Sequence, residues 1–500
     1  MGRLRRMVGN TCISLLGQAV TWSSTLLLTM AYGRFLGDAQ FGKLYVATSF
    51  VTLLGFPIES GFNQQITRDV AQEPSKAPRY LANTIVLKLA FWSTLYGGML
   101  LLAQILGYAP DVRSLIAICG ITLLSGSLGT TFSSLHYAFE RVAFPVVGTI
   151  LEKGLSAALG IVLLTCGAGV QTMALILLGG SLISTIWQGY WFFHLVGRRF
   201  NIDLLLMRSL LKTSIPFLTY GVLGVIYYRL DTILLSEMAN TTVVGWYGAA
   251  YRVFDTLVFL PSLFVGAIVY PVLAKLSAGQ EHHLKLAIEK CLNFLLFCSM
   301  PIATLLITAA PGIIGVIYHR PEFIHTIPAL QALAPGLVFL YANSLYGSII
   351  ISTRHEKRMT VMAGIALVFN LALNVLLIPR YGHVGAAAVT TLTELLLLCL
   401  SILFTPRYLL PGESLWVGAK VLLACGVMAA VMWLLRTCDL FIILPAGGVA
   451  YLAAAAILRA IPREDLQTLY KAIRQKAEQN TDTRQEQLRT AIAAENIKVY

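Results

Sequence analysis

Apolar runs long enough to cross a lipid bilayer recur along almost the whole chain. A membrane-spanning helix needs about 20 predominantly apolar residues. Such runs lie near residues 10–32, 43–65, 81–106, 114–137, 143–165, 171–195, 211–235, 244–274, 287–309, 327–352, 359–378, 383–405, 415–435 and 440–458. Only 12% of the residues are charged, about half the share found in ordinary soluble domains. The runs therefore predict an all-α integral membrane protein with about 14 transmembrane helices.

The Lys and Arg residues in the short loops predict how the chain is oriented, because cytoplasmic loops of membrane proteins carry an excess of both. With the N-terminus in the cytoplasm, eighteen of them fall in cytoplasmic loops and six in outer loops. We therefore expect a multi-pass protein of the cell (inner) membrane with both termini cytoplasmic. The same bias explains the formal net charge of +13, so no nucleic-acid partner is expected.

Charged residues inside the apolar runs need partners, because a lone charge at the bilayer centre costs about 2.5–3.5 kcal/mol. The cations are Lys88, Lys153, Arg229, Arg252 and Lys420, and the acids are Glu59, Glu152, Asp231, Asp255 and Glu394. Arg252 and Asp255 are three residues apart on one helix and can pair locally. Glu152 and Lys153 start about 100° apart, so we expect each to find another partner. Arg229 and Asp231 point to nearly opposite sides of their helix, so they are not a pair.

The two halves of the chain share a sequence pattern. RFLGDAQFGKLYVA at 34–47 and SEMANTTVVGWYGAAYRV at 236–253 align Gly42 with Gly245. Weaker matches pair 138–148 with 354–364 and Gly167 with Gly382. The halves are offset by an even number of spans, so they are parallel repeats, an arrangement that places a transported substrate between them.

This repeat predicts four parts of the chain. An N-terminal six-helix lobe covers 1–200 and a C-terminal six-helix lobe covers 201–410, with a central cavity between the lobes. Two additional transmembrane helices follow in 411–460. A hydrophilic tail over 461–500 is expected in the cytoplasm.

Four stretches together resemble the Wzx-type polysaccharide flippases, whose superfamily also contains the MATE-type multidrug exporters and the lipid II flippase. They are GRFLGDAQFGKLYVA (33–47), RLDTILLSEMANTTVVGWYGAAYRV (229–253), YPVLAKL (270–276) and NVLLIPRYGHVGAAAVTTLTELL (374–396). The resemblance covers roughly residues 1–460 and implies two six-helix lobes in a V around a central cavity, two additional C-terminal helices and alternating access. It also implies a sugar unit linked to polyprenyl pyrophosphate as the substrate. The hydrophilic tail departs from the family pattern.

A pyrophosphate cargo gives the buried cations a role, because guanidinium groups hold phosphate oxygens bidentately and ammonium groups attract them as point charges. We predict a cationic cavity whose substrate-binding residues are Arg34, Lys88, Lys153, Arg229 and Arg252; a structural ion pair is the alternative for each. The candidates for H⁺ or Na⁺ coupling are Glu59, Asp231, Asp255 and Glu394. No metal or other cofactor is expected. Polar residues of the first span, including Ser24 and Thr25, are expected to face a wet cavity or a tight helix contact.

The predicted function is to move a polyprenyl-pyrophosphate-linked oligosaccharide from the cytoplasmic to the outer leaflet for surface polysaccharide synthesis. Membrane lipids, a polysaccharide polymerase and glycosyltransferases are the expected partners. An enzyme acting on such lipids would need a large outer loop, but the longest predicted one, 310–326, is short, and the sequence contains no Gly-rich phosphate loop, HExxH motif or nucleophile elbow. We therefore expect a transporter rather than an enzyme. An ion-coupled multidrug or cation exporter of the same fold is the alternative, and it should have an acidic cavity.

Overall fold

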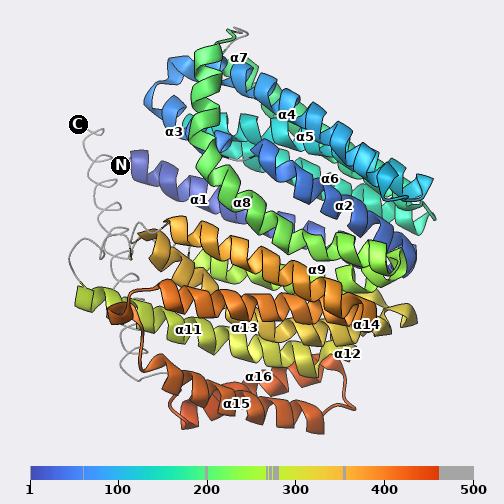
Figure 1. The fold of residues 1–500 in the computed structure, drawn as a ribbon, viewed down its shortest axis with the longest axis vertical. Coiled ribbons are helices and arrows are strands. Elements are labelled where there is room, and N and C mark those ends of the chain that lie inside the picture. Colours follow the sequence, from blue (N-terminus) through green and yellow to red (C-terminus); the bar gives the residue numbers. More distant parts are fainter. Residues whose placement is uncertain are drawn as a thin grey trace, which may run out of the picture.

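Helices make up all the regular structure of the described chain (Figure 1). The computed structural model describes residues 2–59, 61–196, 201–265, 269, 273, 281–352 and 356–460. The all-α prediction is confirmed within these ranges. The tail predicted over 461–500 lies outside the described residues.

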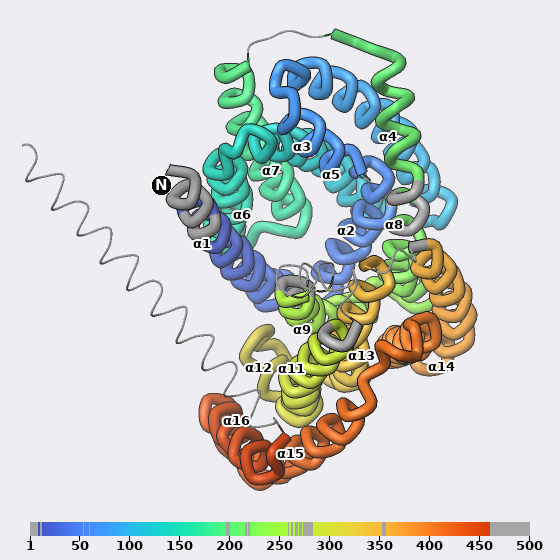
Figure 2. The backbone as a smooth tube through the Cα atoms, turned by 90° about the vertical axis from the view of Figure 1, so that its left-hand side faces the viewer, coloured from blue at the N-terminus to red at the C-terminus, as the bar shows by residue number. Residues whose placement is uncertain are grey.

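The first half of the chain forms a bundle of long helices, coloured blue to teal in Figure 2. These helices are α1 (Gly2–Ala31), α2 (Gly37–Glu59), α3 (Phe62–Gln72), α4 (Ala77–Ile105), α5 (Pro110–Ala138), α6 (Ala143–Thr165) and α7 (Val170–Val196). A π-helical turn, Tyr32–Leu36, leads from α1 towards α2. Within the bundle, α1 packs on α6, α6 on α7, and α7 on α5, which also contacts α2 and α4.

The second half forms another helical bundle. Its helices are α8 (Leu204–Met238), α9 (Thr241–Phe264), α11 (Glu281–Thr308), α12 (Ala310–Tyr318), α13 (Thr326–Ser352) and α14 (Glu356–Phe404), followed by α15 (Ser414–Leu434) and α16 (Leu440–Ile457). Helix α13 packs on α9, α11 and α14, and α8 packs on both α14 and α2. The last two helices pack on each other and on α11, on the side away from the first bundle (Figure 2).

Two glycines that the sequence repeat aligns, one in each half of the chain, mark places where a helix ends. Gly167 separates α6 from α7 with a φ of 85°, and Gly382 divides α14 into two helices with a φ of 56°. Only glycine adopts such positive φ values without steric cost. The sequence match between these two positions therefore marks the same turn in both halves, and it separates the predicted spans 359–378 and 383–405 at the observed place.

Ten segments of the described chain are long and apolar enough to cross a membrane. Two of them, Ile13–Leu53 with 41 residues and Lys357–Phe404 with 48 residues, are each long enough for two crossings. Helices α8 and α9, which carry Arg229, Asp231, Arg252 and Asp255, are not among the ten. The protein is a multi-pass membrane protein.

The predicted span 43–65 is wrong in its boundaries. The helix begins earlier, at Gly37, and ends at Glu59. The chain then turns at Gly61, whose φ is 75°, and continues as the polar helix α3. Polar side chains such as Asn63 and Gln64 follow this turn, and they do not continue an apolar helix in lipid.

Candidate functional site

The two bundles, called lobes from here on, meet where α2 crosses α9 with their backbones in direct contact. A Cβ atom on Gly42 would lie 1.8 Å from the carbonyl oxygen of Thr241, and one on Gly245 would lie 2.1 Å from the carbonyl oxygen of Asp38. No side chain fits at either position. The sequence repeat aligns these two glycines, so the crossing joins equivalent points of the two halves.

Further contacts between the lobes surround this crossing, at the end of the bundle where α2 and α9 begin. Figure 1 shows the lobes approaching each other towards this end, which we call the closed end. The indole nitrogen of Trp246 donates to Oδ2 of Asp38 at 2.8 Å. Arg34 donates to the carbonyl oxygens of Val316 and Ile317 at 2.6 and 3.1 Å, near the end of α12, where a cation also meets the negative end of the helix dipole. Arg34 therefore joins the lobes at the closed end.

The Trp246–Asp38 hydrogen bond gives a first testable prediction. Replacing Trp246 with Phe removes a bond to a charged acceptor, which is worth about 1.5–3 kcal/mol. We expect hydrogen–deuterium exchange in residues 37–45 and 241–248 to accelerate by about tenfold or more. The matched control is Trp92→Phe, which removes an indole hydrogen bond to Gly120 inside the first lobe. Equal exchange in both variants would show that the bond does not hold the lobes together.

A cavity of about 560 Å³ lies between the lobes. Helix α1 forms one wall, and α9, α11 and α12 form the other. Its lining is mostly apolar, and its polar members are Thr25, Thr29, Arg252, Asp255 and Thr256. The cavity thus offers apolar walls to a ligand together with the guanidinium group of Arg252 and the carboxylate of Asp255.

A smaller cavity of about 180 Å³ shares Thr25, Thr29 and Arg252 with the first. It is enclosed mainly by the first lobe, and Arg252 reaches it from α9 of the second. Lys153 and the hydroxyl-bearing residues Ser24, Thr48 and Ser156 also line it. Ser156 is 2% exposed, and its hydroxyl has no hydrogen-bond partner within the described chain. Two cations and the unsatisfied Ser156 hydroxyl make this small cavity suitable for an anion.

Two predicted pairings of these charges are wrong. Lys153 does pair with its neighbour Glu152, at 2.7 Å, because long side chains can meet even when their Cα–Cβ bonds diverge. Asp255 pairs with Arg229 on α8, at 3.4 Å, rather than with Arg252 three residues away. Among the residues that the structure describes, Arg252 is left without an acidic partner.

Arg229 lies in the contact between the lobes. Besides Asp255, its guanidinium donates to the hydroxyl of Tyr45 at 3.0 Å. It lies 5.2–5.9 Å from the ring centroids of Tyr45, Tyr228 and Tyr251, within the range of cation–π attraction. Tyr45 belongs to α2 of the first lobe, and Arg252 also lies over its ring, at 5.7 Å. Arg229 therefore connects the lobes, and only Arg252 of these two cations lines the cavities.

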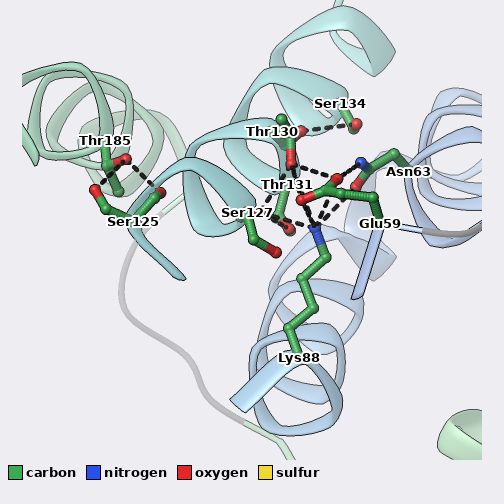
Figure 3. Close-up of polar contacts among 9 residues, drawn as sticks. All are labelled: Glu59, Asn63, Lys88, Ser125, Ser127, Thr130, Thr131, Ser134 and Thr185. Carbon is green, nitrogen blue, oxygen red and sulfur yellow. Dashed lines mark hydrogen bonds and ion pairs between the residues drawn. The ribbon is translucent and has the colours of Figure 1, made fainter. Parts of the chain in front are cut away.

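Lys88 lies inside the first lobe and is fully buried (Figure 3). Its ammonium donates to the Ser127 carbonyl oxygen at 2.8 Å and to the Thr130 hydroxyl at 3.3 Å, and it lies 3.4 Å from a carboxylate oxygen of Glu59. Asn63 adds a fourth contact at 3.4 Å. Lys88 thus links α2, α3, α4 and α5 and does not line either cavity between the lobes.

The four carboxylates predicted for ion coupling lie in different surroundings. Glu59 and Asp255 each face a cation, Lys88 and Arg229 respectively. Asp231 is buried and accepts hydrogen bonds from Tyr247 and Thr232, so it does address different neighbours from Arg229, as predicted. Glu394 is also buried, and it accepts from Tyr227 and Asn343.

The predicted substrate-binding residues therefore divide into three groups. Arg252 and Lys153 come together at the small cavity, Arg34 and Arg229 hold the lobes together, and Lys88 is internal to one lobe. Ser24 and Thr25 line the small cavity, as the polar first span predicts.

The sequence reasoning missed Ser156, although it follows Lys153 by three residues and hence lies on the same helical face. It also missed Tyr45, which no local pattern distinguishes.

Comparison with known proteins places this chain in a family. A family model described as polysaccharide biosynthesis protein matches residues 7–277, and a model of the lipid II flippase MurJ matches residues 192–444. An uncharacterized membrane protein of Methanocaldococcus jannaschii, MJ1068, is 28% identical over 188 residues, which is 37% of this chain and 37% of that protein. The probable low-salt glycan biosynthesis flippase Agl15 of Haloferax volcanii is 21% identical, over 72% of this chain and 75% of its own.

Among solved structures, the lipid II flippase MurJ in an inward closed conformation superposes with a TM-score of 0.73. The two sequences are 15% identical, and the match covers 90% of this chain and 98% of that one. This similarity shows a shared fold of two helical lobes.

Proposed function

The chain belongs to the family of polysaccharide biosynthesis proteins, and we propose that it is a flippase for a polyprenyl-pyrophosphate-linked oligosaccharide. In this proposal it moves the lipid from the cytoplasmic to the outer leaflet of the cell membrane for surface polysaccharide synthesis. The named function of Agl15, a probable glycan biosynthesis flippase, and the match to the MurJ family model support it. The protein acts as a transporter and not as an enzyme.

The two adjoining cavities that meet at Arg252 carry this proposal. The small one offers Arg252, Lys153 and the Ser156 hydroxyl to a compact anion, and cationic donors bind pyrophosphate oxygens strongly. The larger one offers apolar walls beside the same guanidinium. An amphiphile with an anionic pyrophosphate between sugar and hydrocarbon has both kinds of surface, and the hydrocarbon tail would stay in the bilayer while the headgroup crosses.

The closed end supplies the other part of the proposed mechanism. With the N-terminus in the cytoplasm, the crossing of Gly42 and Gly245 seals the outer side, so the cavities take up substrate from the cytoplasmic side. Rocking of one lobe against the other would then separate α2 from α9 and expose the cavities outward, which is alternating access between parallel repeats. The few contacts at the closed end would break and re-form in each cycle.

Ion coupling belongs to the same proposal. Asp231 and Glu394 have only neutral hydrogen-bond donors in the described chain, so a proton or Na⁺ could compensate their charge. Glu59 and Asp255 already face cations and are weaker candidates. Flipping rates that do not change when the pH and Na⁺ gradients are both collapsed would exclude coupling at any of the four.

Arg252→Gln tests the proposed function. We expect it to slow flipping by about a hundredfold, since removing one side of a buried charge contact costs about 2–5 kcal/mol. The flipping rate of Arg252→Lys should lie between those of Arg252→Gln and the unmodified chain, because lysine keeps the charge but loses the bidentate geometry. The measurement uses proteoliposomes that contain a fluorescent polyprenyl-pyrophosphate disaccharide, with a membrane-impermeant quencher that detects the outer leaflet. The matched control is Lys420→Gln on α15, a cation that lines neither cavity. Flipping by Arg252→Gln at the unmodified rate would refute the proposal.

An ion-coupled cation exporter of the same fold is the second candidate. It is favoured by one observation, the presence of Asp255 in the larger cavity beside Arg252. The ion pair of Asp255 with Arg229 compensates that carboxylate, so the surplus charge at the cavities is positive. Efflux of lipophilic cations from the same proteoliposomes, without lipid flipping, would favour the exporter.

A further inference from the structure

The second lobe contains a cavity of its own, with a volume of about 400 Å³. It is lined by residues of α8, α9, α13 and α14, and none of these described residues also lines the two cavities between the lobes. The cavity is lined by residues near both ends of α14 and near the end of α13. They include Ile351 in the last turn of α13, Met359 in the first turn of α14 and Ser401 in the last turn of α14. The cavity therefore lies towards the end of the bundle opposite the closed end.

Glu394 gives this cavity a negative charge. Its side chain is 3% exposed, and its two carboxylate oxygens accept hydrogen bonds from the hydroxyl of Tyr227 at 3.0 Å and the amide of Asn343 at 2.9 Å. Both donors are neutral, and the lining residues within the described part of the chain include no Lys, Arg or His. A buried carboxylate without a counter-charge is costly, and each of its oxygens keeps a free lone pair.

The other polar groups of the cavity also present acceptors. The Ser344 hydroxyl donates its proton to the Tyr341 carbonyl oxygen at 2.7 Å, and the Ser348 hydroxyl donates to the Ser344 carbonyl oxygen at 3.0 Å. The Ser401 hydroxyl donates to the Asn343 side-chain oxygen at 3.4 Å. With their protons used in this way, the hydroxyls offer lone pairs to the cavity. Such a lining repels an anionic headgroup and attracts a cation.

The volume and the apolar walls of the cavity indicate which kind of cation it can hold. A metal ion needs several oxygen ligands at about 2.0–2.6 Å, and a single ion would leave most of the 400 Å³ empty. Much of the remaining lining is apolar, from Leu340, Ile351, Met359, Met362 and Leu397, and methionine side chains adapt to ligands of irregular shape. We infer that this cavity binds a lipophilic organic monocation, with its ammonium charge facing Glu394 and its alkyl groups against the methionines.

This inference does not depend on lipid flipping, but it competes with ion coupling at Glu394, and a binding experiment decides between the two. Equilibrium dialysis of radiolabelled tetraethylammonium against the purified full chain in micelles should show saturable binding. Glu394→Gln should weaken it by about thirtyfold or more, the loss expected when one partner of a buried charge pair is removed. The charge-matched control, Glu322→Gln at an exposed site near the closed end, should bind as the unmodified chain does.

A second variant separates the volume of the cavity from its charge. Met359→Trp would fill the cavity while keeping Glu394, and it should also abolish tetraethylammonium binding while the protein elutes as before in size-exclusion chromatography. Three results would overturn the inference: no saturable binding to the unmodified chain, undiminished binding to Glu394→Gln, or displacement of tetraethylammonium by NaCl at an equal concentration. The last of these would assign the cavity to an inorganic ion.

Discussion

Replacing Gly42 with Val is expected to stop transport almost completely while the helices remain folded. The new Cβ would lie 1.8 Å from a backbone carbonyl oxygen of α9, and a backbone atom cannot move aside as the end of a flexible side chain can. The crossing would have to separate, at a cost of about 3 kcal/mol, the upper part of the range for overpacked contacts. That cost corresponds to roughly a hundredfold loss of the state in which the closed end is sealed. The proteoliposome flipping assay measures the effect.

The sequence repeat supplies a second test of the same contact. Gly245→Val should reproduce the loss, because its Cβ would lie 2.1 Å from the Asp38 carbonyl oxygen. The matched control is Gly179→Ala on α7, where a Cβ would meet no atom within 4 Å. Here flipping should stay at the unmodified rate. Transport by both valine variants at that rate would show that the crossing does not open and close in the cycle.

Removing Glu59 should destabilise the first lobe more than removing its partner Lys88. The Lys88 ammonium is fully buried, whereas the Glu59 side chain is 31% exposed and can reach water. Glu59→Leu leaves a buried charge without its carboxylate, which costs about 3–5 kcal/mol. Lys88→Met leaves a carboxylate that still has Asn63 and Thr130 as donors, so we expect a loss of about 1–2 kcal/mol. Unfolding of the purified protein in mixed micelles, followed by circular dichroism, measures both.

The double variant Glu59→Leu, Lys88→Met should recover much of the stability lost in Glu59→Leu, because an apolar pair replaces the buried ions. The control is Lys153→Met, whose side chain is 40% exposed and whose ion pair with Glu152 is open to solvent, so its removal should cost less than about 1 kcal/mol. Equal losses in Glu59→Leu and Lys88→Met would show that the burial of the ammonium is not what makes this pair important.

Much of the fold could be predicted from the sequence because its signals are local. An apolar run of about 20 residues predicts a helix in lipid wherever it occurs, and glycines such as Gly167 and Gly382 mark turns because positive φ values favour them. The predicted boundaries of the span 43–65 are wrong. This run is apolar over most of its length, but the turn at Gly61 divides it. There the chain turns at Gly61 into α3, which packs against α5 and α8, a contact that the composition of the run does not indicate.

The candidate site could be predicted only in part. The sequence indicated which charged residues lie within the apolar runs, and Arg252 and Lys153 among them do line one cavity. It could not indicate that Arg34 binds the end of α12, more than 280 residues further along the chain. Ser156 became a candidate only because its hydroxyl is buried without a hydrogen-bond partner among the residues that the structure describes.

The sequence by itself determined that this protein is a helical membrane protein, and it predicts two related halves, since segment length, apolar composition and repeated glycines act within one helix or turn. Only the tertiary structure decided which buried charge faces which partner. Asp255 had an arginine three residues away on its own helix, yet it pairs with Arg229 on α8, because the packing of α8 against α9 and α2 brings that guanidinium between Asp255 and Tyr45. That choice, made by helix packing and not by spacing along the chain, leaves Arg252 facing the cavities.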